Sequence, residues 1–220
     1  MKSALDSRRD APAFHRNVAP IRAVLLDLLS GRSGDVLEMG AGTGQHAVAF
    51  SAALPGLRWW PTDAGAAQLD SIEAWRLQAG GSNLQAPFTL DASAAAWGLA
   101  DHGLDDDLVA IVCLNVIHIS PWEVCEGLFA GAGRHLAADG LLILYGPYRC
   151  DGAHTSASNV AFDADLRRRD PGWGIRDIVD LQRIAAENGL ELRSTEPMPA
   201  NNFTLVFAGN RQVAAPTRSG

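Results

Sequence analysis

Val36-Leu37-Glu38-Met39-Gly40-Ala41-Gly42-Thr43-Gly44-Gln45-His46 is the stretch that decides the fold of this 220-residue chain. An apolar run ends beside an acidic residue, a glycine-rich turn follows, and an alanine-rich segment over residues 45–53 begins at once. This order is typical of a first β-strand that leads through a tight loop into a helix of an α/β domain. Glycines have no Cβ atom, so the loop can adopt unusual backbone angles and a ligand can approach its main chain closely.

The spacing of the glycines favours a cationic ligand over a pyrophosphate. A dinucleotide-binding loop reads G-x-G-x-x-G, whereas this loop reads G-x-G-x-G, and Gln45 replaces the third glycine of a dinucleotide site. Glu38 would repel a pyrophosphate and attract a positive charge. S-adenosylmethionine carries a sulfonium and an ammonium group and no phosphate. Residues 38–44 resemble the E-x-G-x-G-x-G motif of class I S-adenosylmethionine-dependent methyltransferases, and this resemblance implies an S-adenosylmethionine site. An NAD(P)-dependent oxidoreductase is the less favoured alternative.

Composition predicts a single globular domain. Hydrophobic residues make up 47% of the chain, and the mean hydropathy is +0.01. The net charge of -7 argues against a broad nucleic-acid surface. Three scattered cysteines indicate neither a disulfide framework nor a metal site. No apolar run approaches the ~20 residues of a membrane span, and the N-terminus does not resemble a secretory signal. We expect a cytoplasmic protein with one domain over residues 12–209, between flexible segments at 1–11 and 210–220.

Acidic residues follow the second and third predicted strands. The second strand, over residues 57–62, ends at Asp63, about 20 residues beyond the glycine loop, where a carboxylate usually binds a ribose diol. Asp63 could also cap the helix predicted over residues 64–79. The third strand, over residues 85–90, ends at Asp91, which would face the adenine amino group. A helix is predicted over residues 21–30, and Asn17 before it could reach a ligand or cap that helix.

The most continuous apolar run, residues 108–114, predicts a strand buried at the centre of a parallel sheet. It delivers Asn115 and His118 to the carboxyl edge of the sheet, where ligands bind. His118 could accept a proton from a substrate, or it could simply bond to the backbone. A fifth strand over residues 141–144 leads to Tyr145 and Tyr148, whose rings could wall a pocket or belong to the core.

Residues 149–176 do not look like another strand–helix repeat, and they predict a substrate lid. The lid contains Trp173 and Arg176. The arginine suggests an acceptor with a carboxylate, although an ion pair with Asp177 or Asp180 is equally compatible with the pattern. A helix over residues 178–188 and two alternating strands complete a mostly parallel seven-stranded sheet with an antiparallel last strand.

The chain resembles the DUF938 family, which includes the methyltransferase-like protein 26 group of class I S-adenosylmethionine-dependent methyltransferases. The resemblance spans about residues 12–208 and implies a Rossmann-like fold and the cofactor, but no acceptor. Its most specific patches are Trp-Gly-x-Arg-Asp at 173–177 and Met-Pro-Ala-Asn-Asn at 198–202. The other matching stretches are residues 12–21, 38–46, 145–148, 158–160 and 170–172.

These observations predict a methyltransferase that moves a methyl group from S-adenosylmethionine to an O or N atom of a small molecule by in-line displacement, leaving S-adenosylhomocysteine. We expect no nucleic-acid or membrane partner and no metal, and either a monomer or a homodimer. The alternatives are a non-catalytic S-adenosylmethionine-binding module and a protein or RNA methyltransferase. The predicted cofactor-binding residues are Asn17, Glu38, Gly40, Ala41, Gly42, Gly44, Gln45, Asp63, Asp91, Ala92 and Asn115. The predicted catalytic residues are His118, Tyr148 and Asp163, and the predicted acceptor-binding residues are Tyr145, Tyr148, Asn159, Trp173, Arg176 and Asn202.

Overall fold

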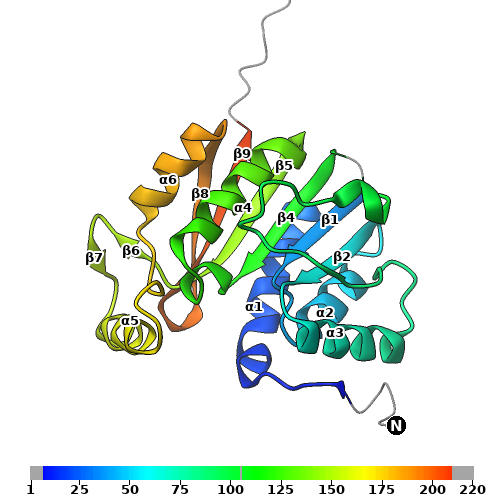
Figure 1. Cartoon of the computed structure of the whole chain (residues 1–220), viewed down its shortest axis with the longest axis horizontal. Helices are drawn as coiled ribbons and strands as arrows, with labels where there is room; N and C mark the ends of the chain where they lie inside the picture. Colours follow the sequence, from blue (N-terminus) through cyan, green and yellow to red (C-terminus); the bar gives the residue numbers. More distant parts are fainter. Residues whose placement is uncertain (1–6, 105, 210–220) are drawn as a thin grey trace, which may run out of the picture.

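Strands with apolar side chains on both faces form the centre of the structure, a computed structural model that describes residues 7–104 and 106–209. The seven-stranded sheet has the order β3-β2-β1-β4-β5-β9-β8 (Figure 1). The five strands from β3 to β5 are parallel, and β9 is antiparallel to both of its neighbours. The predicted fold class is therefore confirmed. The strands are β1 (Gly34–Met39), β2 (Leu57–Asp63), β3 (Phe88–Thr89), β4 (Leu108–Leu114), β5 (Leu136–Gly146), β8 (Leu190–Met198) and β9 (Asn202–Gly209).

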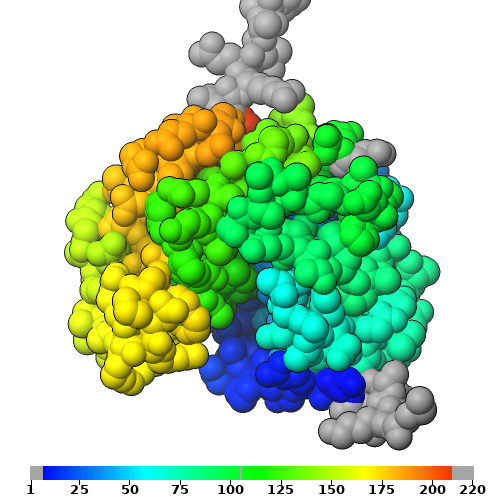
Figure 2. Space-filling model, viewed as in Figure 1, coloured from blue at the N-terminus to red at the C-terminus, as the bar shows by residue number. Residues whose placement is uncertain are grey.

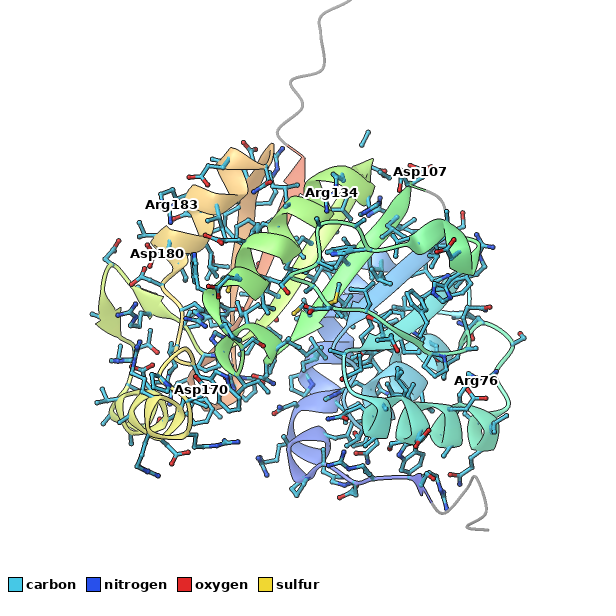
Figure 3. All side chains as sticks on the ribbon, in the orientation of Figure 1. Arg76, Asp107, Arg134, Asp170, Asp180 and Arg183 are labelled. Atoms are coloured by element: carbon cyan, nitrogen blue, oxygen red, sulfur yellow. The ribbon has the colours of Figure 1, made fainter. Side chains whose placement is uncertain are left out.

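Helices cover both faces of the sheet because the strands present buried side chains in both directions. On β4, Ile111 and Cys113 pack toward α4 (Trp122–His135) and α6 (Ile178–Glu187). Ala110 and Val112 pack toward α1 (Pro12–Leu29) and α2 (Gln45–Ala53) on the other face. Charged side chains such as Arg134 on α4 and Arg183 on α6 lie on the outer side of these helices (Figure 3). None of the helices within the described residues has the length and hydropathy of a membrane span.

The largest differences from the predicted boundaries occur in three elements. The first helix begins at Pro12 rather than at residue 21, and it continues through Pro20. Strand β3 has only two residues, because Pro87 lacks the N–H that a longer ladder would need. Strand β5 extends from Leu136 to Gly146, well beyond the predicted residues 141–144.

The segment predicted as a lid has secondary structure of its own. A short hairpin of β6 (Arg149–Cys150) and β7 (Ala153–His154) leads into α5 (Ala157–Arg169), beside the carboxyl edge of the sheet (Figure 1). Ser156 caps α5 by accepting a hydrogen bond from the Asn159 N–H. The remaining elements are α3 (Ala66–Ala79) and the short 3₁₀ helices η2 (Leu99–His102), η3 (Val116–His118) and η4 (Pro199–Asn201).

Candidate functional site

A cavity of about 370 Å³ lies at the carboxyl ends of β1, β2, β3 and β4. Figure 2 shows the surface hollowed on this side of the molecule, between α1 (blue), the start of α3 (cyan) and the inserted segment (yellow). Five of the predicted cofactor residues line it, namely Gly40, Gly42, Asp63, Asp91 and Ala92. Sequence reasoning did not name the rest of the lining, which flanks these positions or follows β4: Met39, Ala64, Gln68, Leu90, Leu114, Val116, Ile119, Ser120 and Val124.

The three glycines of the loop have different roles, although all three have positive φ. A Cβ on Gly42 would meet no atom within 4 Å, so its Cα faces open space beside the cavity. A Cβ on Gly40 would lie 2.4 Å from Val116 Cγ2, and one on Gly44 would lie 2.7 Å from the Ile72 Cα. Gly44 therefore allows α3 to pack closely, whereas Gly42 leaves room for a ligand.

We expect the Gly42→Ala and Gly44→Ala variants to fail in different ways. Gly44→Ala places a methyl group against helix backbone at φ +88°, so it should lower the free energy of unfolding by about 2–3 kcal/mol. Gly42→Ala should lower the free energy of unfolding by only about 1 kcal/mol, the cost of a left-handed backbone conformation for alanine. Its methyl group, however, enters the space beside the cavity. It should weaken S-adenosylhomocysteine binding at least tenfold. Urea unfolding and calorimetric titration of both variants separate these effects, and equal losses of stability would contradict this assignment of roles.

Asp63 joins the glycine loop to the end of β2. Its Oδ2 accepts a hydrogen bond from the Gly42 N–H at 3.0 Å, and its Oδ1 accepts one from the Gly65 N–H at 3.0 Å. The N-cap of α3 is Gly65, so the interpretation of Asp63 as the helix cap is wrong. A carboxylate oxygen can accept more than one hydrogen bond, so Asp63 retains acceptor capacity toward the cavity.

Asp91 lines the same cavity and follows β3, the strand next to β2. Its Oδ1 accepts hydrogen bonds from the Ser93 N–H at 2.9 Å and the Ser93 hydroxyl at 2.7 Å. These bonds orient the carboxylate, whose Oδ2 has no hydrogen-bond partner among the residues that the structure describes. The cavity thus combines an open glycine loop with two carboxylates.

Glu38 lies behind the loop, on the sheet face that α1 and α2 cover. It is 2% exposed, and its Oε2 accepts a hydrogen bond from Trp59 Nε1 at 2.6 Å. Burial raises the pKa of Glu38 to about 7, the Trp59 bond opposes this, and the charge of Asp63 adds to it. A buried carboxyl that titrates near neutrality responds strongly to a nearby cation.

The other predicted cofactor residues do not line the cavity. The Ala41 N–H donates to the Thr62 carbonyl oxygen at 2.8 Å, and the Asn115 N–H donates to the Tyr145 carbonyl oxygen at 2.8 Å. Asn17 lies within α1, whose N-cap is Ala11, so its interpretation as a helix cap is wrong. The side-chain amide of Gln45 bonds to residues near the N-terminus rather than facing a ligand.

His118 and Tyr148 are buried beneath the inserted segment, 1% and 0% exposed, with their rings in edge contact. Nδ1 of His118 accepts a hydrogen bond from the Arg176 N–H at 3.4 Å. Burial, followed by the charge of Arg176, lowers the pKa of His118 to about 3. Burial raises the pKa of Tyr148 well above its usual value. Neither side chain lines the cavity, and these pKa shifts favour neutral His118 and protonated Tyr148 at neutral pH.

Arg176 holds the loop after β4 in place. Its guanidinium donates to the carbonyl oxygens of Ile117 at 2.8 Å, Ser120 at 2.5 Å and Gly172 at 3.0 Å, and it lies 5.5 Å above the Trp122 ring. The structure describes no ion pair between Arg176 and Asp177 or Asp180, so that alternative is wrong. Because Ser120 lines the cavity, Arg176 helps to shape the cavity wall from outside.

The remaining predicted residues connect the inserted segment to its surroundings. Burial alone would raise the pKa of Asp163, but bonds from the Ile175 N–H and from Arg167 hold that pKa below its usual value. The other contacts are from Asn159 Nδ2 to the Asn201 carbonyl oxygen at 3.0 Å, from Asn202 Nδ2 to the Tyr145 hydroxyl at 3.1 Å, and between Arg169 and the Trp173 ring at 5.0 Å.

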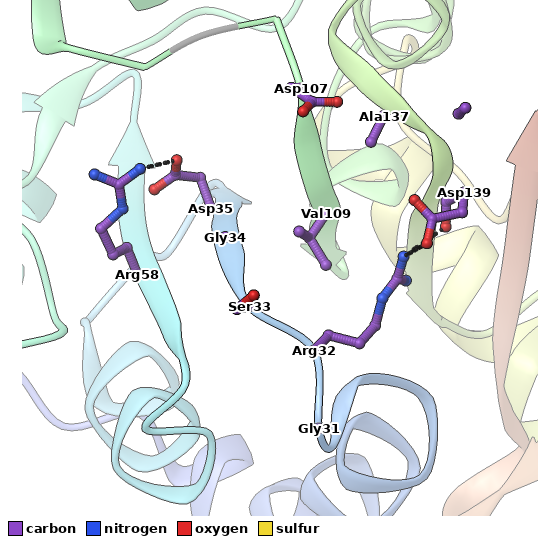
Figure 4. Close-up of a pocket in the computed structure, with 11 residues that line it drawn as sticks. Gly31, Arg32, Ser33, Gly34, Asp35, Arg58, Asp107, Val109, Ala137 and Asp139 are labelled. Atoms are coloured by element: carbon purple, nitrogen blue, oxygen red, sulfur yellow. Dashed lines mark hydrogen bonds and ion pairs between the residues drawn. The ribbon is translucent and has the colours of Figure 1, made fainter.

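A larger hollow of about 670 Å³ lies at the opposite edge of the sheet (Figure 4). It is lined by the amino ends of β1 and β4, and its charges are largely paired, Arg58 with Asp35 and Arg32 with Asp139. Ligands of open α/β sheets bind at the carboxyl ends of the strands, so this hollow is not the candidate site. No group of three or more potential metal ligands occurs within residues 7–104 and 106–209.

Comparison with known families identifies the chain. A family model described as a protein of unknown function, DUF938, matches residues 8–209. The chain belongs to the DUF938 family. The predicted family is therefore confirmed.

Three of the solved structures that match this chain illustrate the shared fold. The S-adenosylmethionine-dependent methyltransferase SibL, in its apo form, is 18% identical with a TM-score of 0.71, and the match covers 90% of this chain and 56% of SibL. The O-methyltransferase NcsB1 from neocarzinostatin biosynthesis, solved with S-adenosylmethionine and 2-hydroxy-5-methyl naphthoic acid, is 15% identical with a TM-score of 0.70, covering 90% and 54%. YcgJ from Bacillus subtilis is 17% identical with a TM-score of 0.64, covering 87% and 98%.

These similarities establish that the DUF938 chain has the fold of S-adenosylmethionine-dependent methyltransferases. The chain spans about half the length of SibL and of NcsB1, and nearly the whole length of YcgJ. These identities, 15–18%, are too low to transfer residue roles from those structures to this chain.

Proposed function

We propose that the protein is an S-adenosylmethionine-dependent methyltransferase acting on an O or N atom of a small molecule. The observation that carries the proposal is the hydrogen bond from Gly42 to Asp63 inside the cavity, which joins an open glycine loop to a carboxylate. The cavity fits the cofactor on chemical grounds. A Cβ at Gly42 would intrude on the space beside it, and Asp63 and Asp91 offer acceptors without offering phosphate-binding cations.

Each residue of the cavity has a defined task in this proposal. Asp63 would accept hydrogen bonds from the ribose hydroxyls, Asp91 would accept one from the adenine amino group, and Glu38 would supply negative charge behind the loop. Bound S-adenosylmethionine supplies a methyl carbon that its sulfonium already activates for displacement. The protein then has to align the acceptor and exclude water.

General-base catalysis by His118 does not fit its surroundings, because it does not line the cavity and burial lowers its pKa to about 3, which makes the neutral imidazole a weak base. Without a base at His118, the acceptor would arrive with a free lone pair, or lose its proton to solvent or to another group. The net charge of -7 favours a small-molecule acceptor over RNA.

Calorimetric titration with S-adenosylmethionine, S-adenosylhomocysteine, NAD and NADP tests the proposal. We expect micromolar binding of the two sulfur ligands and none of the nicotinamide cofactors. Methyl transfer from labelled S-adenosylmethionine to a panel of phenols, carboxylic acids and amines, with RNA and protein as comparisons, then tests the acceptor. Binding of NAD alone, or of none of these ligands, would contradict the methyltransferase hypothesis. Binding of S-adenosylmethionine without methyl transfer would indicate a non-catalytic module.

The pH dependence of turnover tests the role of His118. Because a histidine with a pKa of about 3 is neutral throughout pH 5–8, kcat at saturating cofactor should show no midpoint that depends on this residue. Any midpoint in that range should persist in His118→Gln, since it then belongs to the acceptor or to another group. A midpoint between pH 6 and 7 that disappears in the variant would show that His118 is a general base.

A further inference from the structure

Residues 9–11 form a strap across the outer side of the glycine loop, although the sequence predicts a flexible segment up to residue 11. The Arg9 N–H donates to Ser71 Oγ at 2.9 Å, and Trp75 Nε1 donates to the Arg9 carbonyl oxygen at 3.0 Å. The strap leads directly into α1 and runs beneath α2 and α3 in Figure 1 (dark blue). It therefore connects α1 to the loop region through α3. The part of the predicted flexible segment over residues 1–6 lies outside the described residues.

Gln45 connects the same strap to the loop through both ends of its amide. Its Oε1 accepts hydrogen bonds from the Ala11 N–H at 2.8 Å and the Thr43 hydroxyl at 3.0 Å, and its Nε2 donates to Asp10 Oδ1 at 2.8 Å. Gln45 is 5% exposed, so these bonds form largely out of solvent. His15 Nε2 also contacts Asp10 Oδ1, at 2.8 Å.

Thr43 is bonded both to Gln45 and to Ser71, the two residues that contact the strap. Its hydroxyl bonds to Gln45, and its carbonyl oxygen accepts a hydrogen bond from Ser71 Oγ at 2.8 Å. Ser71 is fully buried, and it is also the acceptor of the Arg9 N–H. Thr43 stands next to Gly42, whose N–H bonds to Asp63 inside the cavity. The loop is thus held by Asp63 on the cavity side and by Ser71 and Gln45 on the outer side.

We propose that Gln45 is a positioning residue through which the N-terminal strap sets the backbone geometry of the glycine loop, and so the affinity of the site for its cofactor. This inference rests on the proposed function for its ligand. The position of Gln45 in the glycine motif predicts direct contact with the cofactor. The proposal instead gives Gln45 a role in which it does not touch the ligand. An amide is required because the side chain donates to a carboxylate and accepts from an N–H and a hydroxyl at the same time.

Reversing the polarity of one hydrogen bond tests the proposal. Gln45→Glu keeps the acceptor for Ala11 and Thr43 but loses the donor, and it places two carboxylates together. We expect it to raise the Kd for S-adenosylhomocysteine at least tenfold at pH 8. Asp10→Asn alone retains an oxygen acceptor and should change the Kd less than threefold. The double variant restores a donor–acceptor pair in the opposite sense and should return the Kd to within threefold of wild type.

Two further measurements separate positioning from general loss of structure. Amide hydrogen exchange at residues 41–45 should be faster in Gln45→Glu and return to the wild-type rate in the double variant. As a control, Gln182→Glu makes the same change on the exposed surface of α6. It should alter neither the Kd for S-adenosylhomocysteine nor the exchange rates at residues 41–45. If wild type does not bind S-adenosylhomocysteine, the proposed function fails while the exchange rates still test the strap. Wild-type affinity and exchange in Gln45→Glu, or failure of the double variant to restore them, would overturn the positioning role.

Discussion

Replacing Asp63 with alanine is expected to weaken S-adenosylhomocysteine binding by roughly 10²- to 10⁴-fold, because two charge-assisted hydrogen bonds at about 1.5–3 kcal/mol each would be lost. The effect has two sources. The carboxylate is the ribose acceptor in the proposed site, and its Oδ2 also holds the Gly42 N–H at 3.0 Å. Asp63→Asn should have an intermediate effect, because its amide can replace only one of the two acceptor oxygens.

Calorimetric titration of both variants, beside Asp70→Ala, measures this effect. Asp70 lies on the exposed side of α3, so its replacement changes the net charge equally without touching the cavity. Asp70→Ala should bind as wild type does. If Asp63→Ala and Asp70→Ala bind S-adenosylhomocysteine equally well, Asp63 is not a cofactor residue and the cavity has another occupant.

Replacing Glu38 with glutamine is expected to stabilise the protein at pH 8 by about 3 kcal/mol and to weaken the binding of S-adenosylmethionine. The pKa of Glu38 is raised from 4.5 to about 7 in the folded protein, mainly by burial. A group with a raised folded pKa contributes its stability fully below pH 4.5 and loses it as the pH rises through 7. Glutamine avoids that loss and can still accept the hydrogen bond from Trp59 Nε1. Urea unfolding at pH 4.5 and pH 8 should show the difference only at the higher pH.

The same pKa predicts that ligand binding is coupled to a proton. A cation near the loop favours the ionised form of Glu38, so binding of S-adenosylmethionine at pH 6.5 should release protons, and the affinity should rise between pH 6 and pH 8. Calorimetry in buffers with different ionisation enthalpies counts these protons. Glu38→Gln should release fewer protons than wild type. An unchanged number of released protons would show that Glu38 does not sense the cofactor.

A gain in stability together with a loss of affinity would identify Glu38 as a residue kept for function. Burial of an ionisable carboxyl costs free energy, and proteins retain such groups mainly where a ligand or a reaction uses them. Glu38 meets this description, because it is 2% exposed and lies directly behind a glycine loop with an open face.

Local patterns in the sequence determined the sheet, the loop and the acidic residues of the cavity. Alternating apolar runs and turns predict strands and helices, and the carboxyl ends of parallel strands meet at one edge of a sheet. For this reason Gly42, Asp63 and Asp91 could be assigned to one site from their places at strand ends, and the cavity contains all three.

Only the tertiary structure decided which of the remaining polar residues face a ligand and which hold the fold together. The amide of Gln45 bonds to residues 34 and 35 positions earlier in the chain, and Arg176 bonds to carbonyl groups 56 and 59 positions earlier. His118 is buried because the inserted segment folds over it, which removes the water that would support its charge. Partners so distant in sequence leave no local pattern, because a side chain's chemistry shows what it can bind while only packing determines what it meets.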